Sequence, residues 1–260
     1  MRIQRLSTAS YKFFSPGGIV VLVDPWLTND PFWPLSEKTP EKLKEIDVVA
    51  ITHSHFDHAS GVKEISAQNE KAVVIAQAEY SFTLQRRGVK NTIPTNFGAT
   101  VLLQGMKFSM VPASHTSMEM NRDGKAEVIG IPAGYVIEFE NGQKVYVSGD
   151  TGLTADMKFV VSDYHRPHIS ILPVTGGLIM EPEQAAYAAN IIGSRYVIPT
   201  HDFPRDVNGA ADPGAYKAFL KWNSVLDSYK KVDTFMEIMK RDYPHIEAVY
   251  IPIGGTAEIG

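Results

Sequence analysis

The stretch Thr52-His53-Ser54-His55-Phe56-Asp57-His58 holds three histidines and an aspartate within six positions, although the whole chain of 260 residues has only eight histidines. It follows residues 47–52, a short apolar run typical of a strand that is covered on both faces. In an extended chain, side chains 53, 55 and 57 point to the same side. His53 and His55 could therefore bind one ion, while a turn before Gly61 directs Asp57 and His58 toward a second ion.

The chemistry of these side chains favours a metal site. Imidazole nitrogens and carboxylate oxygens suit zinc, manganese or iron, and the absence of cysteine excludes thiolate ligands. A polar surface loop is the alternative interpretation. A single histidine would favour that alternative, whereas a cluster of this density directly after a buried strand favours metal binding.

Four residues cannot complete two metal sites, so further ligands are expected at other strand ends. Three polar residues in turns of small residues follow apolar strand-like runs: His115 after 107–111, Asp150 after the hairpin 134–148 with its Asn-Gly turn, and His201 after 195–200. Each of them alone could be an ordinary loop residue. Asp150-Thr151-Gly152 also matches an aspartic-protease motif, but the chain lacks the second Asp-Thr-Gly or Asp-Ser-Gly that a carboxylate dyad requires.

The remaining pattern alternates strands and helices. Further strands are expected at 18–24, 72–76 and 101–103, and a last one at 248–253, with helices at 40–45, 182–192, 213–226 and 233–242. Such a mixture predicts sheets covered by helices in a single α/β domain over residues 1–260.

The composition argues against some classes of binding partner and indicates the cellular compartment. The net charge is −4 and no run of lysines or arginines occurs, which argues against a nucleic-acid partner. No apolar run approaches the roughly 18 residues of a membrane span, and the N-terminus lacks the apolar core of a signal peptide. We therefore expect a cytoplasmic protein without a nucleic-acid or membrane partner, and the small-molecule substrate is an expectation that comes only with the family resemblance below. Whether it forms a homo-oligomer is left open.

The order of these motifs resembles the metallo-β-lactamase superfamily, from Leu22-Val23-Asp24-Pro25 to Pro199-Thr200-His201. Within it, Asp24-Pro25-Trp26-Leu27, residues 149–153 and Leu172-Pro173-Val174 resemble the branch that contains L-ascorbate 6-phosphate lactonase. The resemblance implies an αββα sandwich, with two mixed β-sheets flanked by helices. It also implies a dinuclear site with one metal on His53, His55 and His115, the other on Asp57, His58 and His201, and Asp150 bridging them.

The same resemblance implies a metal-dependent hydrolase with two divalent metal ions per chain, zinc being favoured over manganese or iron. A bridging hydroxide would attack an ester, lactone or phosphoester bond, and Asp57 would also hold or shuttle a proton. Asp24, Thr52 and Thr200 are candidates to support the ligands. The alternatives are an iron-dependent oxidoreductase on the same fold, and a phosphodiesterase or nuclease acting on nucleic acid. Flavodiiron relatives typically carry Glu where this chain has His55, which disfavours the first alternative.

Three other features bear on the substrate. Leu6-Ser7-Thr8-Ala9-Ser10 stands where several relatives have a Gly-His-Ser/Ala turn, and Asp202 follows the last ligand where relatives often have Tyr. Both positions are candidates for specificity. The segment 24–34 carries Trp26 and Trp33, and it is interpreted either as a lid over the metals or as a packed loop or subunit contact.

Overall fold

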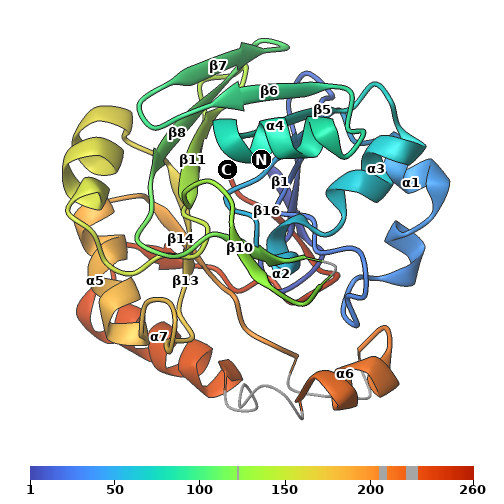
Figure 1. The fold of residues 1–260 in the computed structure, drawn as a ribbon. Coiled ribbons are helices and arrows are strands. Elements are labelled where there is room, and N and C mark those ends of the chain that lie inside the picture. Colours follow the sequence, from blue (N-terminus) through green and yellow to red (C-terminus); the bar gives the residue numbers. More distant parts are fainter. Residues whose placement is uncertain (122, 205–209, 221–227) are drawn as a thin grey trace.

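The computed structural model describes residues 1–121, 123–204, 210–220 and 228–260. Within these ranges, two seven-stranded sheets lie face to face and helices cover their outer sides (Figure 1). The helices α1, α3 and α4 lie on one outer side, and α5 and α7 lie on the other. This is the predicted αββα sandwich.

The first sheet contains the strand that leads into the histidine cluster. Its strands, in spatial order, are β16 (Thr256–Glu258), β1 (Arg2–Arg5), β2 (Tyr11–Phe14), β3 (Val20–Val23), β4 (Val48–Ala50), β5 (Val73–Gln77) and β6 (Thr92–Thr95). The strands from β16 to β3 pair antiparallel, and those from β3 to β6 pair parallel.

The second sheet contains the strands that precede the other candidate ligands. In spatial order they are β15 (Glu247–Ala248), β14 (Tyr196–Thr200), β13 (Ile169–Pro173), β12 (Lys144–Val147), β11 (Ala133–Glu138), β8 (Met106–Pro112) and β7 (Thr100–Leu103). Here β7 to β12 pair antiparallel and β12 to β15 pair parallel.

Helices and a small hairpin complete the described elements. The helices are α1 (Pro40–Lys44), α2 (Phe56–Ala59), α3 (Val62–Gln68), α4 (Ala78–Arg86), α5 (Pro182–Ile192), α6 (Pro213–Leu220) and α7 (Ser228–Asp242), with a 3-10 turn η1 (Leu35–Glu37) and a π-helix η2 (Met157–His165). The hairpin pairs β9 (Met118–Met120) with β10 (Ala126–Val128). None of the helices in the described ranges combines the length and hydropathy that a membrane span needs.

The continuous apolar runs of the strands fill two different cores. In β4, Val48 and Ala50 point into the core between the sheets, while Val49 packs against the outer helices with Leu43 and Ile65. The second sheet repeats this alternation against α5, α7 and η2. Because successive strand residues face opposite sides, a strand covered on both faces reads as an unbroken apolar run.

The structure corrects several element boundaries. The strand predicted for 248–253 is short, since only Glu247–Ala248 pairs with β14. The last helix already includes Ser228, where the described residues resume, and so extends further toward the N-terminus than the predicted start at 233. The helix predicted for 213–226 is described as far as Leu220, and its remainder lies outside the described residues.

Candidate metal centre

The opening histidine cluster lies where β4 ends and α2 begins. His55 is the residue before the helix and has an extended backbone (φ −58°, ψ 148°). Asp57 and His58 lie within the helix Phe56–Ala59. The expectation that residues 53, 55 and 57 share one side of an extended chain is therefore wrong for Asp57. It is the helical turn that brings Asp57 and His58 back toward the site.

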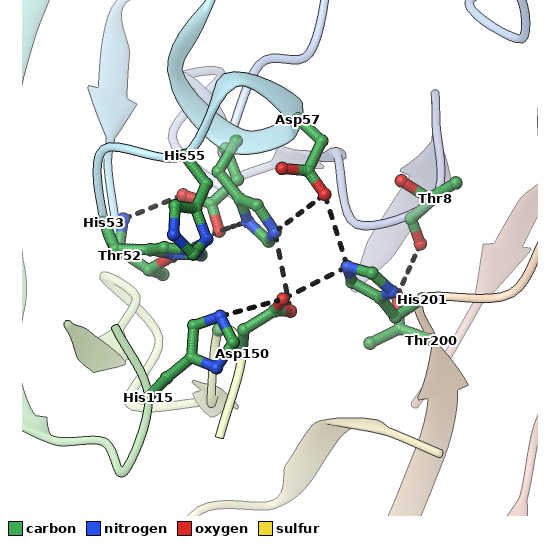
Figure 2. Close-up of polar contacts among 12 residues, drawn as sticks. Thr8, Thr52, His53, His55, Asp57, His115, Asp150, Thr200 and His201 are labelled. Atoms are coloured by element: carbon green, nitrogen blue, oxygen red, sulfur yellow. Dashed lines mark hydrogen bonds and ion pairs between the residues drawn. The ribbon is translucent and has the colours of Figure 1, made fainter. Parts of the chain in front are cut away.

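The other three candidate ligands come from the second sheet. His115 follows β8, Asp150 follows β12, and His201 follows β14. Figure 2 shows Asp150 between His115 and His201, with Asp57 pointing at His201 from the opposite side. His201 has a left-handed backbone with φ 70°, which is uncommon for a residue with a side chain.

All seven predicted ligands converge. Ligand atoms lie within 4.8 Å of one another in three overlapping groups: His53, His55 and His115; His53, His58 and Asp150; and Asp57, His58 and His201. The first and third groups are the two ligand sets that the family resemblance implies. Asp150 belongs to the group between them.

The spacing of these atoms suits shared cations better than direct hydrogen bonds. The Nε2 atom of His201 lies 3.2 Å from Asp150 Oδ2 and 3.5 Å from Asp57 Oδ2. Asp150 Oδ1 lies 3.4 Å from His58 Nε2, and Asp150 Oδ2 lies 3.6 Å from His115 Nε2. Two atoms bound to one tetrahedral zinc at about 2.0–2.1 Å lie about 3.3 Å apart.

Two buried nitrogens at the centre lack a hydrogen-bond partner. Among the described residues, neither His58 Nε2 nor His201 Nε2 makes a hydrogen bond, although both atoms are buried. A buried polar atom without a partner costs free energy, so it calls for an explanation. A bound divalent metal ion supplies one, and it fits the donor set of histidine nitrogens and carboxylate oxygens.

Asp24, predicted to support the ligands, contacts the cluster directly. Its Oδ2 lies 2.9 Å from His58 Nδ1 and accepts a 2.7 Å hydrogen bond from the Thr52 hydroxyl. Its Oδ1 accepts the backbone N–H of Thr52 at 2.8 Å. His58 can therefore donate through Nδ1 and leave the lone pair of Nε2 facing the site.

Thr52 orients a second ring in the same way. Its hydroxyl lies 3.0 Å from His53 Nδ1. Because the Thr52 hydroxyl donates its proton to Asp24, the same oxygen accepts a hydrogen bond from Nδ1–H of His53. The Nε2 atom of His53 then carries no proton and keeps its lone pair. That Nε2 lies 2.9 Å from Nδ1 of His55, so the two nitrogens must share either a proton or a cation.

His115 and His201 are positioned by the backbone. His115 Nδ1 lies 3.1 Å from the carbonyl oxygen of Leu178, a contact with no signal in the sequence because any residue supplies a carbonyl. The Thr200 hydroxyl donates to the Thr8 carbonyl at 2.8 Å, and the backbone N–H of His201 donates to the same oxygen at 3.0 Å. Thr200 thus supports the strand end, and no hydrogen bond is described between its hydroxyl and a ligand ring.

Burial and the neighbouring aspartate carboxylates determine whether the histidine rings of the cluster are protonated. Burial lowers the pKa of His53 well below its usual value. Burial also opposes protonation of His201, but Asp150 and Asp57 outweigh it and raise the pKa to about 10. Burial would raise the pKa of Asp150, yet His201 and His58 hold it well below its usual value. A divalent cation entering this site competes with the protons on these rings.

The cluster lies at the wall of a large cavity of about 1030 Å³. Trp26 and Trp33 are buried and do not line it, which favours the packed-loop interpretation over the lid. Trp26 instead packs edge-on against Phe56, at a centroid distance of 5.6 Å, and Phe56 forms part of the cavity wall.

Comparison with known proteins agrees with this geometry. The family model of the beta-lactamase superfamily domain matches residues 20–201. The chain belongs to the metallo-β-lactamase superfamily. A UPF0173 metal-dependent hydrolase of Rubrobacter xylanophilus is 36% identical over 203 residues, which are 77% of this chain and 81% of the relative. This superfamily member therefore groups with metal-dependent hydrolases.

Solved structures share the fold. The metallo hydrolase Igni18 of Ignicoccus hospitalis matches with a TM-score of 0.70 and 25% identity, covering 100% of this chain and 99% of its own. CmlA, a diiron beta-hydroxylase of Streptomyces venezuelae, matches with a TM-score of 0.73 and 14% identity, covering 99% of this chain and 54% of its own. Both a metallo hydrolase and a diiron beta-hydroxylase thus contain this architecture, and the fold alone does not decide the reaction.

Proposed function

We propose that this superfamily member uses a dinuclear metal centre to hydrolyse an ester, lactone or phosphoester bond of a small molecule. The observation that carries the proposal is the convergence of seven histidine and aspartate side chains at a cavity wall, with the buried Nε2 atoms of His58 and His201 lacking hydrogen bonds. Two divalent ions in such a site supply an activated water and polarise the oxygen of the bond that is broken.

The ligand roles follow the three overlapping groups. His53, His55 and His115 would hold one ion, and Asp57, His58 and His201 would hold the other. Asp150 would bridge them, because its Oδ1 faces His58 while its Oδ2 faces both His115 and His201. Zinc suits this nitrogen-rich set, and manganese or iron is the alternative.

Asp57 is the proposed proton carrier. Burial would raise the pKa of its carboxyl group, but His58 and His201 lower it below the usual value, so the group is ionised at neutral pH. The side chain also lines the cavity, where a substrate would arrive. Oδ2 is the oxygen that faces His58 and His201, so the other oxygen of Asp57 would be left to accept a proton from the attacking water and to deliver it to the leaving group.

The resemblance of residues 24–27 and 149–153 to the lactonase branch supports lactones as one class in a substrate panel. The fold shared with the diiron enzyme CmlA gives an iron-dependent oxidoreductase as the second candidate. Zinc in the purified protein would exclude the second candidate, because an iron-dependent oxidoreductase requires a redox-active ion and zinc is not one.

The test combines elemental analysis with a panel of lactones, carboxylic esters, phosphomonoesters and phosphodiesters. Two zinc or manganese ions per chain, and turnover that His55→Ala abolishes, would support the proposal. His245→Ala is the matched control, since His245 is exposed and does not line the cavity. Iron in the purified protein, together with oxygen consumption and no hydrolysis of the panel, would contradict it.

A further inference from the structure

The cavity extends well beyond the candidate ligands. At about 1030 Å³ it lies at the upper end of the range for sites that hold drug-sized molecules. On one side of the metal cluster its wall is formed by α2, α3, α4, the segment after α4 and the hairpin strand β9. We call this part the apolar arm and define it by Ala59, Val62, Tyr80, Leu84, Val89 and Met118.

The residues that define the apolar arm have mainly apolar side chains, and most of these side chains are buried. Val62, Leu84 and Val89 belong to the core cluster behind the first sheet, and each is no more than 3% exposed. These side chains therefore serve both as core packing and as cavity wall. A substrate group that enters the arm leaves water, and an apolar group gains free energy by doing so.

Apart from the candidate ligands, two of the charged residues on the elements that form the arm neutralise each other. Arg87 and Glu119 both line the cavity and form an ion pair with each other. Burial and the neighbouring Glu119 carboxylate raise the pKa of the Tyr80 hydroxyl well above its usual value. Lys63 is the other charged residue there, and it is exposed, so its long side chain can keep the ammonium group in water. The arm thus offers no concentrated positive charge for a phosphate or carboxylate.

We propose that the apolar arm binds an extended apolar substituent, such as an alkyl or aryl chain, attached to the bond that is cleaved. This inference rests on the proposed metal centre, because the metals would hold the polar head of the substrate while the arm holds its tail. It favours an ester or lactone that carries an apolar chain over a small phosphorylated sugar lactone. Small polar substrates would leave the arm filled only with water.

The test uses binding rather than turnover. Straight-chain alkyl hydroxamates from C2 to C8 carry a metal-binding head and a tail of variable length, and their dissociation constants can be measured calorimetrically on the metal-loaded protein. Each methylene buried in the arm should tighten binding roughly three- to four-fold. A parallel series of carboxylic esters with the same acyl chains should show kcat/KM rising with length.

Blocking the arm should remove this dependence. Leu84→Trp places a larger side chain on the wall, and the affinity gain from C2 to C8 should fall at least ten-fold while two metals remain bound. Leu102→Trp is the matched control, because Leu102 lies on β7 of the other sheet, is 73% exposed and does not line the cavity. It should keep the full gain.

The outcomes separate the two proposals. Equal affinity for the C2 and C8 hydroxamates on wild-type protein overturns the apolar arm and leaves the metal centre intact, and this result does not depend on any variant folding. A folded, metal-loaded Leu84→Trp that keeps the gain also overturns it. Failure of every hydroxamate to bind overturns the metal centre and the arm together. Length-dependent binding without hydrolysis of any panel substrate supports the arm and contradicts the proposed hydrolase.

Discussion

Arg5 Nη2 lies 2.7 Å from Asp202 Oδ1, and both side chains are almost completely buried. The same nitrogen donates to the Thr8 carbonyl at 2.7 Å, and the backbone N–H of His201 donates to that carbonyl as well. The ion pair therefore ties the loop after β1 to the segment that carries the last candidate ligand. Asp202, proposed from the sequence as a specificity position, is part of this buried network and does not line the cavity.

Removing one partner of this ion pair should destabilise the folded protein. Asp202→Ala leaves the Arg5 guanidinium buried without a counter-charge, and the free energy of unfolding should fall by about 3–5 kcal/mol. Equilibrium urea unfolding measures the loss. The double variant Arg5→Met/Asp202→Leu should lose clearly less than Asp202→Ala alone. If the double variant loses the sum of both single changes, the two side chains are not coupled.

Asp24→Asn should weaken metal binding without removing a ligand. The amide no longer provides the charged acceptor for His58 Nδ1, and loss of such a partner typically lowers metal affinity 10- to 100-fold. Competition with a chromophoric chelator measures the affinity. Asp47→Asn is the matched control, because Asp47 also accepts a strand N–H, from Val20 at 2.8 Å, but lies outside the cluster. An unchanged affinity in Asp24→Asn would show that the Asp24–His58 contact does not tune the metal.

Asp150→Ala should lower the metal content by at least one ion per chain. The carboxylate faces His58, His115 and His201, so its removal takes a ligand from both sets. Elemental analysis after gel filtration measures the stoichiometry, with Asp163→Ala as an exposed control. Two ions retained in Asp150→Ala would refute the bridging role.

Asp30 should give the folding stability a pH dependence of its own. Burial raises the pKa of its carboxyl group from 3.8 to about 7 and outweighs the opposing effects of the nearby Ser7 side chain and of the backbone N–H of Phe32. The folded state thus holds this proton more tightly than the unfolded state does. The contribution of Asp30 to stability is therefore present at acid pH and is lost as the pH rises from about 4 to about 7, by up to about 4 kcal/mol.

Asp30→Asn should abolish that loss. The amide stays neutral and can still accept the Phe32 N–H that Asp30 Oδ1 accepts at 2.8 Å. At pH 8 the free energy of unfolding of the variant should exceed that of wild type by about 2 kcal/mol or more, and at pH 4 the two values should be similar. Urea unfolding at both pH values measures this. Equal differences at the two pH values would mean that the Asp30 carboxyl group titrates normally.

The place of the candidate ligands in the fold follows from the sequence, because each of them comes after a strand with an apolar run. Val48 to Ala50 and Tyr196 to Thr200 are buried on both faces, and polar residues directly after such runs have to lie at a sheet edge. The Asn-Gly signal likewise locates the hairpin before Asp150. Strand ends can be predicted from local composition, and these ends carry the site.

Features that depend on distant partners could not be predicted in the same way. The Arg5–Asp202 pair joins residues 197 positions apart, and nothing in either local sequence marks it. The helical turn at Phe56 is too short to show a periodic pattern. The hairpin of β9 and β10 has exposed residues along β10, so it lacks the buried alternation that identifies a strand.

The candidate ligands are divided between the two sheets. His53, His55, Asp57 and His58 follow a strand of the first sheet, whereas His115, Asp150 and His201 follow strands of the second. Neither sheet alone carries either of the two proposed ligand sets, so the loading of metal would depend on the docking of the two sheets. A bound pair of ions would link the two sheets at one edge. Removal of the ions with a chelator should therefore let the two sheets separate at a lower temperature.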